Sequence, residues 1–224
     1  MPHSHRREPE SVALTTHPTE LGTMVLAATD DALVYCGFDE PVAVRRRLTG
    51  AGLRETPVSP QDGAEAQVSP QEGAEAQVSP QEGARPSATV LTRARTQLDA
   101  YLAGTSRTFR LPLDLRLATP FSRQTVLALE DFVPYGRTAT YKELATAMAR
   151  PRAARAVGTA LGANPLCVVL PCHRIVGSTG RLTGYAGGVP AKRFLLDLEA
   201  RPEAAPCPSS RRGRQAVAAS ADRP

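Results

Sequence analysis

Residues 57 to 84 read PVSPQDGAEAQVSPQEGAEAQVSPQEGA, a ten-residue unit repeated nearly three times. Each unit carries a single valine, so the segment cannot build a hydrophobic core, and its richness in Pro, Gly, Ala, Gln and Glu is typical of disordered chain. A period of ten residues is also too short for the helical solenoid classes. We therefore predict a solvated, disordered loop, and the folded core must come from the sequence on either side of it.

The charge of the repeat differs from that of the whole chain. Between Glu55 and Ala84 there are six acidic residues and no basic ones, so we expect this loop to avoid a DNA backbone. The chain as a whole is basic, with a formal net charge of +5. Such a bias permits a nucleic-acid partner without establishing one.

The composition indicates a globular protein of the cytoplasm. With 42% hydrophobic residues, the 224 residues can form one large domain or two small ones. We find no run of about 18 apolar residues that could span a bilayer, and the N-terminus lacks the apolar stretch of a signal peptide. We expect reduced thiols, because the cysteines follow neither a disulfide-framework nor a CxxC spacing. The four cysteines are Cys36, Cys167, Cys172 and Cys207.

The sequence around the repeat predicts a small α+β domain over residues 20–116. Two apolar runs, TMVLAAT and ALVYCGF, are separated by Asp30 and Asp31, a pattern typical of a β-hairpin. After the repeat, residues 90–104 place apolar side chains at helical spacing and end in a glycine, as helices often do. FRLPLDLRL then returns to an extended pattern.

The sequence of residues 117–200 predicts a mostly helical C-terminal domain. PFSRQTVLALEDFV and TATYKELATAMA read as helices, and the second is opened by a capping-box pair, Thr140 and Glu143. RAARAVGTALGAN follows after a short break, so these two short helices suggest a helix-turn-helix. PAKRFLLDLEA is a last helix, with proline in its first turn. We expect disorder in residues 1–19 and in a frayed basic tail over residues 201–224.

The helix predicted for RAARAVGTALGAN has two different faces. Positions i, i+3, i+4 and i+7 are apolar and face inward, whereas the opposite face combines two arginines with small side chains. Such a face can approach a nucleic-acid groove closely, although an ordinary solvated helix face is the alternative. The charge of this region favours nucleic-acid binding, because residues 117–200 carry ten Lys and Arg against five Asp and Glu. The inward positions are Ala154, Val157, Gly158 and Leu161, and the outward ones are Arg152, Arg155, Ala156, Thr159 and Ala163.

A cysteine and a histidine are neighbours at the start of a glycine-rich turn. Cys172 follows the apolar run LCVVLP, which we predict to be a buried strand, and His173 is the only histidine after residue 17. A free thiol has a pKa of about 8.5, so a nucleophilic cysteine needs a base or a positive partner. Neighbouring side chains of an extended chain point different ways, so a water molecule could link the two. A buried cysteine beside a capping histidine is the alternative, whereas a metal site with Cys167 would lack a fourth ligand.

Four ordered segments, which together cover residues 119–200, are similar to one protein family. PCHRIVGSTGRLTGYAGG resembles the active-site signature of the O6-alkylguanine-DNA alkyltransferases, or methylated-DNA protein-cysteine methyltransferases. VPYGRTATYKELA, ARAVGTALGANP and AKRFLLDLE resemble the family's tyrosine segment, recognition helix and closing helix. The resemblance implies a small N-terminal α/β domain of ribonuclease H-like type, followed by a mostly helical C-terminal domain with a helix-turn-helix of winged-helix type. The N-terminal half resembles the family only in its pattern of strands and helices.

The resemblance implies a DNA repair protein that takes an alkyl group, mainly methyl, from O6 of guanine onto Cys172. His173 would act as the base through a water molecule, Glu199 would hold that histidine, and Asn164 would help to orient the thiol. A thioether at Cys172 has no leaving group, so each molecule would react once, as a suicide enzyme without a cofactor. The range of alkyl groups and any activity toward O4-alkylthymine stay open.

The same resemblance implies binding to double-stranded DNA through the minor groove, with the damaged nucleotide flipped into a pocket. Arg155 would fill the vacated stack, Tyr141 would press on the phosphate, and Tyr185 would donate to the departing O6. Small side chains on the recognition helix suit a groove about 6 Å wide. We expect a monomer that does not bind membranes. Further DNA contacts are expected from Arg152, Ala156, Thr159 and Arg174.

The chain also departs from the family pattern. It contains no tryptophan, and FSRQTVLAL stands where the family usually has one. Some relatives carry an N-terminal zinc site, which His3, His5, His17 and Cys36 do not reproduce, so we expect no metal. Two other functions stay open: a noncatalytic DNA-binding damage sensor, which would need no thiol, and a Cys-His hydrolase. The hydrolase would need an oxyanion hole and would leave the helix-turn-helix without a role.

Overall fold

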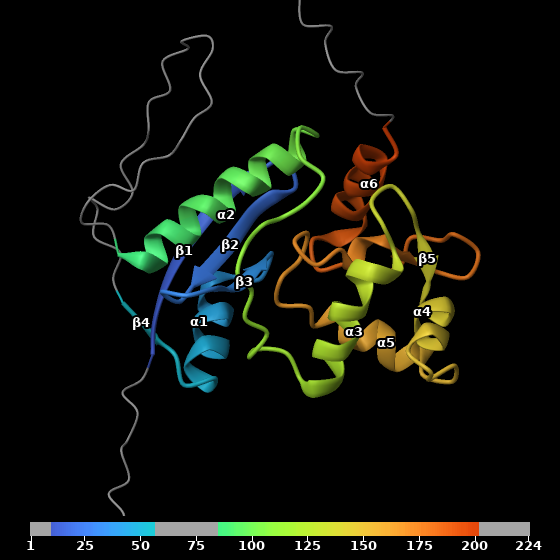
Figure 1. Cartoon of the computed structure of the whole chain (residues 1–224), viewed down its shortest axis with the longest axis horizontal. Helices are drawn as coiled ribbons and strands as arrows, with labels where there is room; N and C mark the ends of the chain where they lie inside the picture. The colour runs from blue at the N-terminus through green and yellow to red at the C-terminus, as the bar shows by residue number, and fades with distance from the viewer. Residues whose placement is uncertain (1–9, 57–84, 202–224) are drawn as a thin grey trace, which may run out of the picture.

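The computed structural model describes residues 10–56 and 85–201 (Figure 1). The acidic repeat at 57–84, which we predict to be a disordered loop, lies outside the described residues, as do residues 1–9 and the basic tail from 202 onward. Within the two described stretches, no helix is long and apolar enough to cross a membrane.

The N-terminal part contains a four-stranded sheet with the strand order β3-β2-β1-β4. β1 (Ser11–Thr19) and β3 (Leu33–Gly37) both run antiparallel to β2 (Gly22–Ala28), and the short β4 (Arg54–Glu55) is parallel to the start of β1. The predicted hairpin is confirmed as β2 and β3, with the aspartate pair between them. The helix predicted after the repeat is confirmed as α2 (Pro86–Leu102).

Helices pack on opposite faces of the sheet, because alternate side chains of a strand point to opposite sides. In β2, Val25 and Ala27 belong to a buried cluster that includes Val44 of α1 (Pro41–Gly50). Leu26, which lies between them, belongs instead to a larger cluster that takes in α2 and the C-terminal half of the chain. Figure 1 shows α2 lying along the sheet on this second side. The sheet and the C-terminal helices therefore share one core.

The first strand shows that the expected disorder of residues 1–19 is wrong from Ser11 onward. Val12 and Leu14 of β1 are buried among the residues that pack against α1. Most of the polar residues of β1 lie beyond β4, which pairs only with Ser11 and Val12. That stretch of β1 is an edge, where threonine, histidine and proline are tolerated, and its polar composition hid the strand in the sequence.

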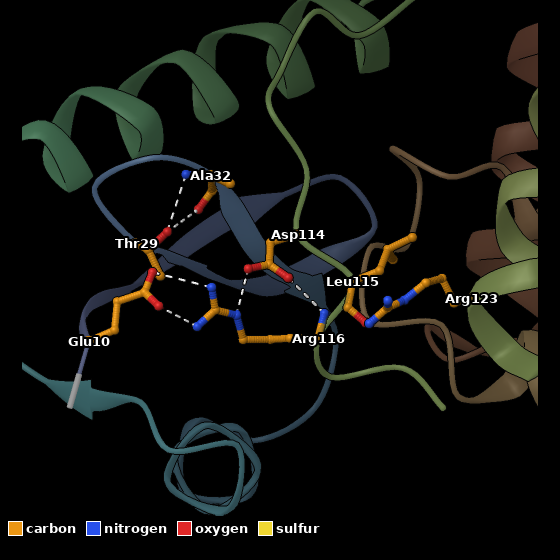
Figure 2. Close-up of polar contacts among 7 residues, drawn as sticks. All are labelled: Glu10, Thr29, Ala32, Asp114, Leu115, Arg116 and Arg123. Carbon is orange, nitrogen blue, oxygen red and sulfur yellow. Dashed lines mark hydrogen bonds and ion pairs between the residues drawn. The ribbon is translucent and has the colours of Figure 1, made fainter. Parts of the chain in front are cut away.

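The connector between the two halves is fastened to both of them. FRLPLDLRL, predicted to be extended, makes an isolated bridge to β3 rather than a strand of its own. Figure 2 shows how it is held: the Arg116 guanidinium donates to Asp114 and to Glu10, in each case over 2.5 Å. Arg123 of the following helix donates to the Leu115 carbonyl over 3.2 Å. These contacts fix where the C-terminal helices start relative to the sheet.

The C-terminal part confirms the predicted helices. Its helix-turn-helix is the pair α4 and α5, which pack against each other and against the preceding α3. The capping box is confirmed as well, because Thr140 and Glu143 exchange side-chain and backbone hydrogen bonds at the start of α4. The elements are α3 (Pro120–Phe132), β5 (Ala139–Thr140), α4 (Tyr141–Ala147), α5 (Ala154–Gly162), β6 (Ile175–Val176) and α6 (Gly188–Glu199), with β5 and β6 paired in parallel.

Candidate active site

A buried asparagine organises the turn that carries the cysteine. Asn164 lies just after α5, and its side-chain Nδ2 donates to the Leu170 carbonyl over 3.0 Å and to Cys172 Sγ over 3.2 Å. Its Oδ1 accepts the Leu166 amide hydrogen over 3.0 Å. One amide group therefore holds both ends of the turn and points a donor at the sulfur. This geometry suits the role that the resemblance implies for Asn164.

The run LCVVLP is buried as predicted, but it is a tight turn and not a strand. The Leu170 amide donates to the Leu166 carbonyl over 2.8 Å, and Val168 has a positive φ of 71°, which a β-branched residue rarely adopts. The Asn164 side chain stabilises this turn through its bonds to the Leu166 amide and the Leu170 carbonyl. A short apolar run is typical of both a buried strand and a buried turn, so the sequence alone could not distinguish these two structures.

The turn is joined to the N-terminal sheet through its backbone. Cys36 of β3 accepts a hydrogen bond from the Cys167 amide and donates one to the Pro165 carbonyl, both over 2.7 Å. The start of the turn that leads to Cys172 therefore pairs alongside strand β3. Cys172 is therefore positioned by both halves of the chain.

Cys172 begins a short 3-10 helix and has only 5% of its surface exposed. Its pKa is lowered from the ordinary thiol value, chiefly by a hydrogen bond from the Cys167 thiol, and further by the Asn164 amide and the positive charge of Lys192, against the opposing effect of burial. Donors and a cation around a sulfur favour the thiolate, which is the nucleophilic form. The site therefore favours a reactive thiol despite its burial.

His173 is fully buried and paired with a carboxylate. Its Nε2 lies 2.6 Å from Glu199 Oε1. An ionised carboxylate only accepts hydrogen bonds, so Nε2 carries the proton and Nδ1 keeps a free lone pair. Among the described residues, Nδ1 has no hydrogen-bond partner. Burial lowers the pKa of His173 and outweighs the opposing effect of Glu199, so the imidazole is a neutral base.

Glu199 is the centre of this network. Its carboxylate accepts hydrogen bonds from the Tyr101 hydroxyl, from His173, from the Gly136 amide over 3.0 Å and from Arg174 Nε over 2.9 Å. Burial on its own raises the pKa of Glu199, but the hydrogen bonds from His173 and Tyr101 and the charge of Arg174 outweigh it and lower the pKa to about 2. Glu199 is therefore an anion at neutral pH, as the resemblance requires of the group that holds the histidine.

Arg174 is placed differently from the expectation. We expected a DNA contact, but the side chain is buried, with 7% of the residue exposed, and its Nη1 donates to the Val133 carbonyl over 2.9 Å. The guanidinium also lies 5.6 Å from the centre of the Tyr135 ring. Its charge is used inside the protein to balance Glu199, a partner 25 residues away that local sequence does not connect with it. The prediction of a DNA contact for Arg174 is wrong.

Tyr185 comes from the glycine-rich segment to the same place. Its ring packs edge-on against His173, with ring centres 6.3 Å apart, and its buried hydroxyl has no hydrogen-bond partner among the described residues. Burial raises the pKa of Tyr185, with a further effect from Cys167 and Cys172, so the hydroxyl keeps its proton close to the thiols. Tyr141 lies at the start of α4, where its hydroxyl is 2.9 Å from Thr183 Oγ1.

The predicted recognition helix has the two faces expected of it. Val157 and Leu161 of α5 are buried, while Ala154 and Gly158 are half-buried at the edge of that inward face. The five outward positions are exposed, which leaves two arginines and three small residues on an open surface. Those exposed residues are Arg152, Arg155, Ala156, Thr159 and Ala163.

The sequence reading missed Lys192 and Tyr101. Lys192 is 1% exposed, and its Nζ donates to the Ile175 carbonyl over 2.5 Å. One signal was available: Lys192 falls on the inward stripe of α6 together with Leu195 and Glu199, where a lysine is out of place unless it has partners. Tyr101 gave no such signal, because a tyrosine on the apolar face of α2 is typical of an ordinary core residue.

Within the described residues, no group of His, Cys, Asp and Glu side chains could hold a metal ion.

Comparison with family models gives two matches that follow one another along the chain. Residues 12–115 match the ribonuclease-like domain of 6-O-methylguanine DNA methyltransferase. Residues 120–201 match the DNA binding domain of the same family.

Curated relatives carry the name methylated-DNA--protein-cysteine methyltransferase. The protein from Mycobacterium tuberculosis is 46% identical over 114 residues, which are 51% of this chain and 68% of the relative. The protein from Methanosarcina barkeri is 49% identical over 109 residues, 47% of this chain and 66% of the relative. The matches thus span about two thirds of these relatives.

Solved structures agree with the family matches. The crystal structure of the M. tuberculosis O6-methylguanine methyltransferase is 32% identical with a TM-score of 0.61, covering 86% of this chain and 96% of that one. A structure of M. tuberculosis OGT in complex with DNA gives a TM-score of 0.59 at 31% identity, covering 85% and 92% of the two chains. The chain therefore belongs to the 6-O-methylguanine DNA methyltransferase family.

Proposed function

We propose that this protein repairs DNA by moving alkyl groups, mainly methyl, from O6 of guanine to its own Cys172. The observation that carries the proposal is the placement of the Cys172 sulfur 3.2 Å from the Asn164 amide, in the residue that directly precedes a neutral histidine held by Glu199. The reaction consumes a reduced thiol, so the cytoplasm, where thiols stay reduced, is the compartment that suits it.

The chemical step is a direct displacement at the alkyl carbon. The Cys172 thiolate forms a bond to that carbon while the bond from the carbon to O6 breaks, and the electron pair stays on the guanine. The thiol proton passes to His173 Nδ1, with a water molecule between them, and the Tyr185 hydroxyl donates to the departing O6. The product thioether has no leaving group, so the protein works once per molecule and needs no cofactor.

The DNA is held by the exposed face of α5 and by α4. A base inside the duplex cannot reach a thiol that is 5% exposed, so the damaged nucleotide is extruded into the site. α5 enters the minor groove, where Ala156 and Thr159 allow close approach, Arg152 reaches the backbone and Arg155 takes the place of the extruded base. Tyr141 presses on the phosphate of the extruded nucleotide. One copy of the chain supplies every group in this scheme, so we infer that it acts as a monomer.

Incubation with an oligonucleotide that holds one O6-methylguanine tests this function. We expect the tryptic peptide that carries Cys172 to gain one methylene unit of mass, up to one per protein molecule, and the Cys172→Ala variant to gain none. Tandem mass spectrometry of the peptide locates the added group. Lesion-selective binding without any gain of mass would instead indicate a damage sensor, and continued turnover would indicate a hydrolase.

Replacing Arg155 by alanine separates base extrusion from chemistry. Extrusion of the base costs a few kcal/mol, and Arg155 offsets part of this cost by taking the place of the base. Its loss should therefore slow transfer from duplex DNA by about tenfold, equivalent to about 1.4 kcal/mol. Transfer from the free base O6-methylguanine, measured by the same mass assay, should keep its rate. Equal losses on both substrates would show that Arg155 acts on the thiol site rather than on the stacked duplex.

The charge of Lys192 should appear in the pH dependence of transfer. That charge lowers the pKa of Cys172, so Lys192→Met should raise it. Because the thiolate is the reacting form, the rate-against-pH curve of the variant should shift to higher pH, with the largest loss of rate on the acidic side. Arg193→Met, at the exposed neighbouring position, is the matched control and should leave the midpoint where it is. An unshifted midpoint in Lys192→Met would contradict the electrostatic role.

A further inference from the structure

A second buried thiol contacts the same asparagine as the acceptor cysteine. Cys167 is 1% exposed, and its Sγ lies 3.5 Å from the Asn164 carbonyl oxygen, while the side chain of the same asparagine contacts Cys172 Sγ. The electrostatic interaction between the two thiols raises the pKa of Cys167 and lowers that of Cys172. Alkyl transfer to Cys172 requires a single thiol, so the reaction leaves Cys167 without a chemical step of its own.

The turn that separates the two cysteines is already closed. The Leu170 amide bonds the Leu166 carbonyl, and the Cys172 amide bonds the Leu170 carbonyl, both over 2.8 Å. Cys167 and Leu170 also form a β-bridge. Joining the two sulfurs would therefore cost little chain entropy, because the chain between them is ordered before the bond forms. A disulfide needs the sulfurs to close to about 2.05 Å, and both sulfurs already contact the same asparagine.

We propose that Cys167 is a resolving thiol, which forms a disulfide with Cys172 after a hydroperoxide has oxidised Cys172. In the first step the Cys172 thiolate attacks one peroxide oxygen, the O–O bond breaks, and the sulfur becomes a sulfenic acid while hydroxide or alkoxide leaves. In the second step the Cys167 sulfur attacks the Cys172 sulfur, and the sulfenic hydroxyl leaves as water with the proton of Cys167. Two thiols lose two electrons, and one hydroperoxide gains them.

The two cysteines are suited to different steps. The Cys172 sulfur accepts a hydrogen bond from the Asn164 amide, and the Lys192 charge favours its thiolate. It is also 5% exposed against 1% for Cys167, so it is the sulfur that a small peroxide meets first. The pKa of Cys167 is raised well above that of a free thiol, first because it donates a hydrogen bond to Cys172 and then because it is buried. Oxidation of Cys172 to an uncharged sulfenic acid removes the first of these causes, and so frees Cys167 for the second step.

The disulfide would protect a protein that can be used only once. Sulfinic and sulfonic acids at a cysteine are in general not reversed, whereas a dithiol reductant reopens a disulfide. Oxidised protein would then be held in an inactive form that returns to the alkyl-accepting form on reduction. This consequence rests on the proposed function, but formation of the disulfide does not depend on it.

Peptide mapping of the full-length protein after treatment with hydrogen peroxide tests the proposal. Trypsin cuts after Arg155 and Arg174, so residues 156–174 form one peptide that contains both cysteines and lacks Cys36. We expect this peptide to lose two hydrogens in mass and to resist a thiol-alkylating reagent under denaturing, non-reducing conditions. Alkyl transfer should fall as the disulfide accumulates, and dithiothreitol should restore both the peptide mass and the transfer.

Variants at the two neighbouring cysteines provide the comparison. In Cys167→Ser and Cys167→Ala, the same treatment should carry Cys172 to sulfinic or sulfonic acid, and dithiothreitol should restore little of each variant's own starting rate. Cys36 is the matched control, because it is buried beside the same turn and burial raises its pKa to about 12. Cys36→Ser should behave as wild type.

Three outcomes would overturn the proposal: sulfinic acid in wild type without loss of two hydrogens, a disulfide that joins the 156–174 peptide to the one with Cys36, or equal recovery in the Cys167 variants. Failure of the proposed function is seen separately. It would leave untreated wild type without any methyl gain from O6-methylguanine DNA, while the peptide map would still report whether the disulfide forms.

Discussion

The buried carboxylate of Glu199 is the interaction on which the rest of the site depends. It lies at the end of α6 and receives hydrogen bonds from Tyr101 of α2, from the Gly136 amide, and from His173 and Arg174 beside the acceptor cysteine. An unpaired buried charge is costly, so these partners have to assemble around it when the chain folds. Because Tyr101 belongs to the N-terminal half, formation of the catalytic network is tied to the packing of the two halves.

The charges inside the site are divided between two groups of side chains. Arg174 supplies the permanent positive charge that balances Glu199, which allows burial to keep His173 neutral and able to take a proton. Lys192 supplies a second charge on the side of Cys172, where it favours the thiolate. A neutral base and a thiol with a lowered pKa are thus neighbours in sequence within a buried site. Arg155 of α5 and Arg152, which precedes that helix, are exposed and take no part in balancing these internal charges.

Local signals in the sequence predicted the parts of the fold that local forces determine. The capping box at Thr140, the apolar spacing of the helices and the outward face of α5 all depend on residues within a few positions of each other, and each is confirmed. Arg174 could not be placed in this way, because its partner Glu199 comes from another element, whereas Lys192 was missed although its inward position on α6 was a signal. The first strand was missed for the same reason, since the sheet supplies the burial that its polar sequence does not suggest.

Nitrogen-15 NMR of His173 across a pH titration tests the account of the site most directly, because it reports the tautomer and the charge that Glu199 imposes. The network predicts, at neutral pH, a proton on Nε2, a bare Nδ1, and a titration midpoint below the ordinary histidine value of 6.5. A protonated Nδ1 with a bare Nε2, or a midpoint above that value, would contradict the assignment of His173 as a neutral base held by an ionised Glu199.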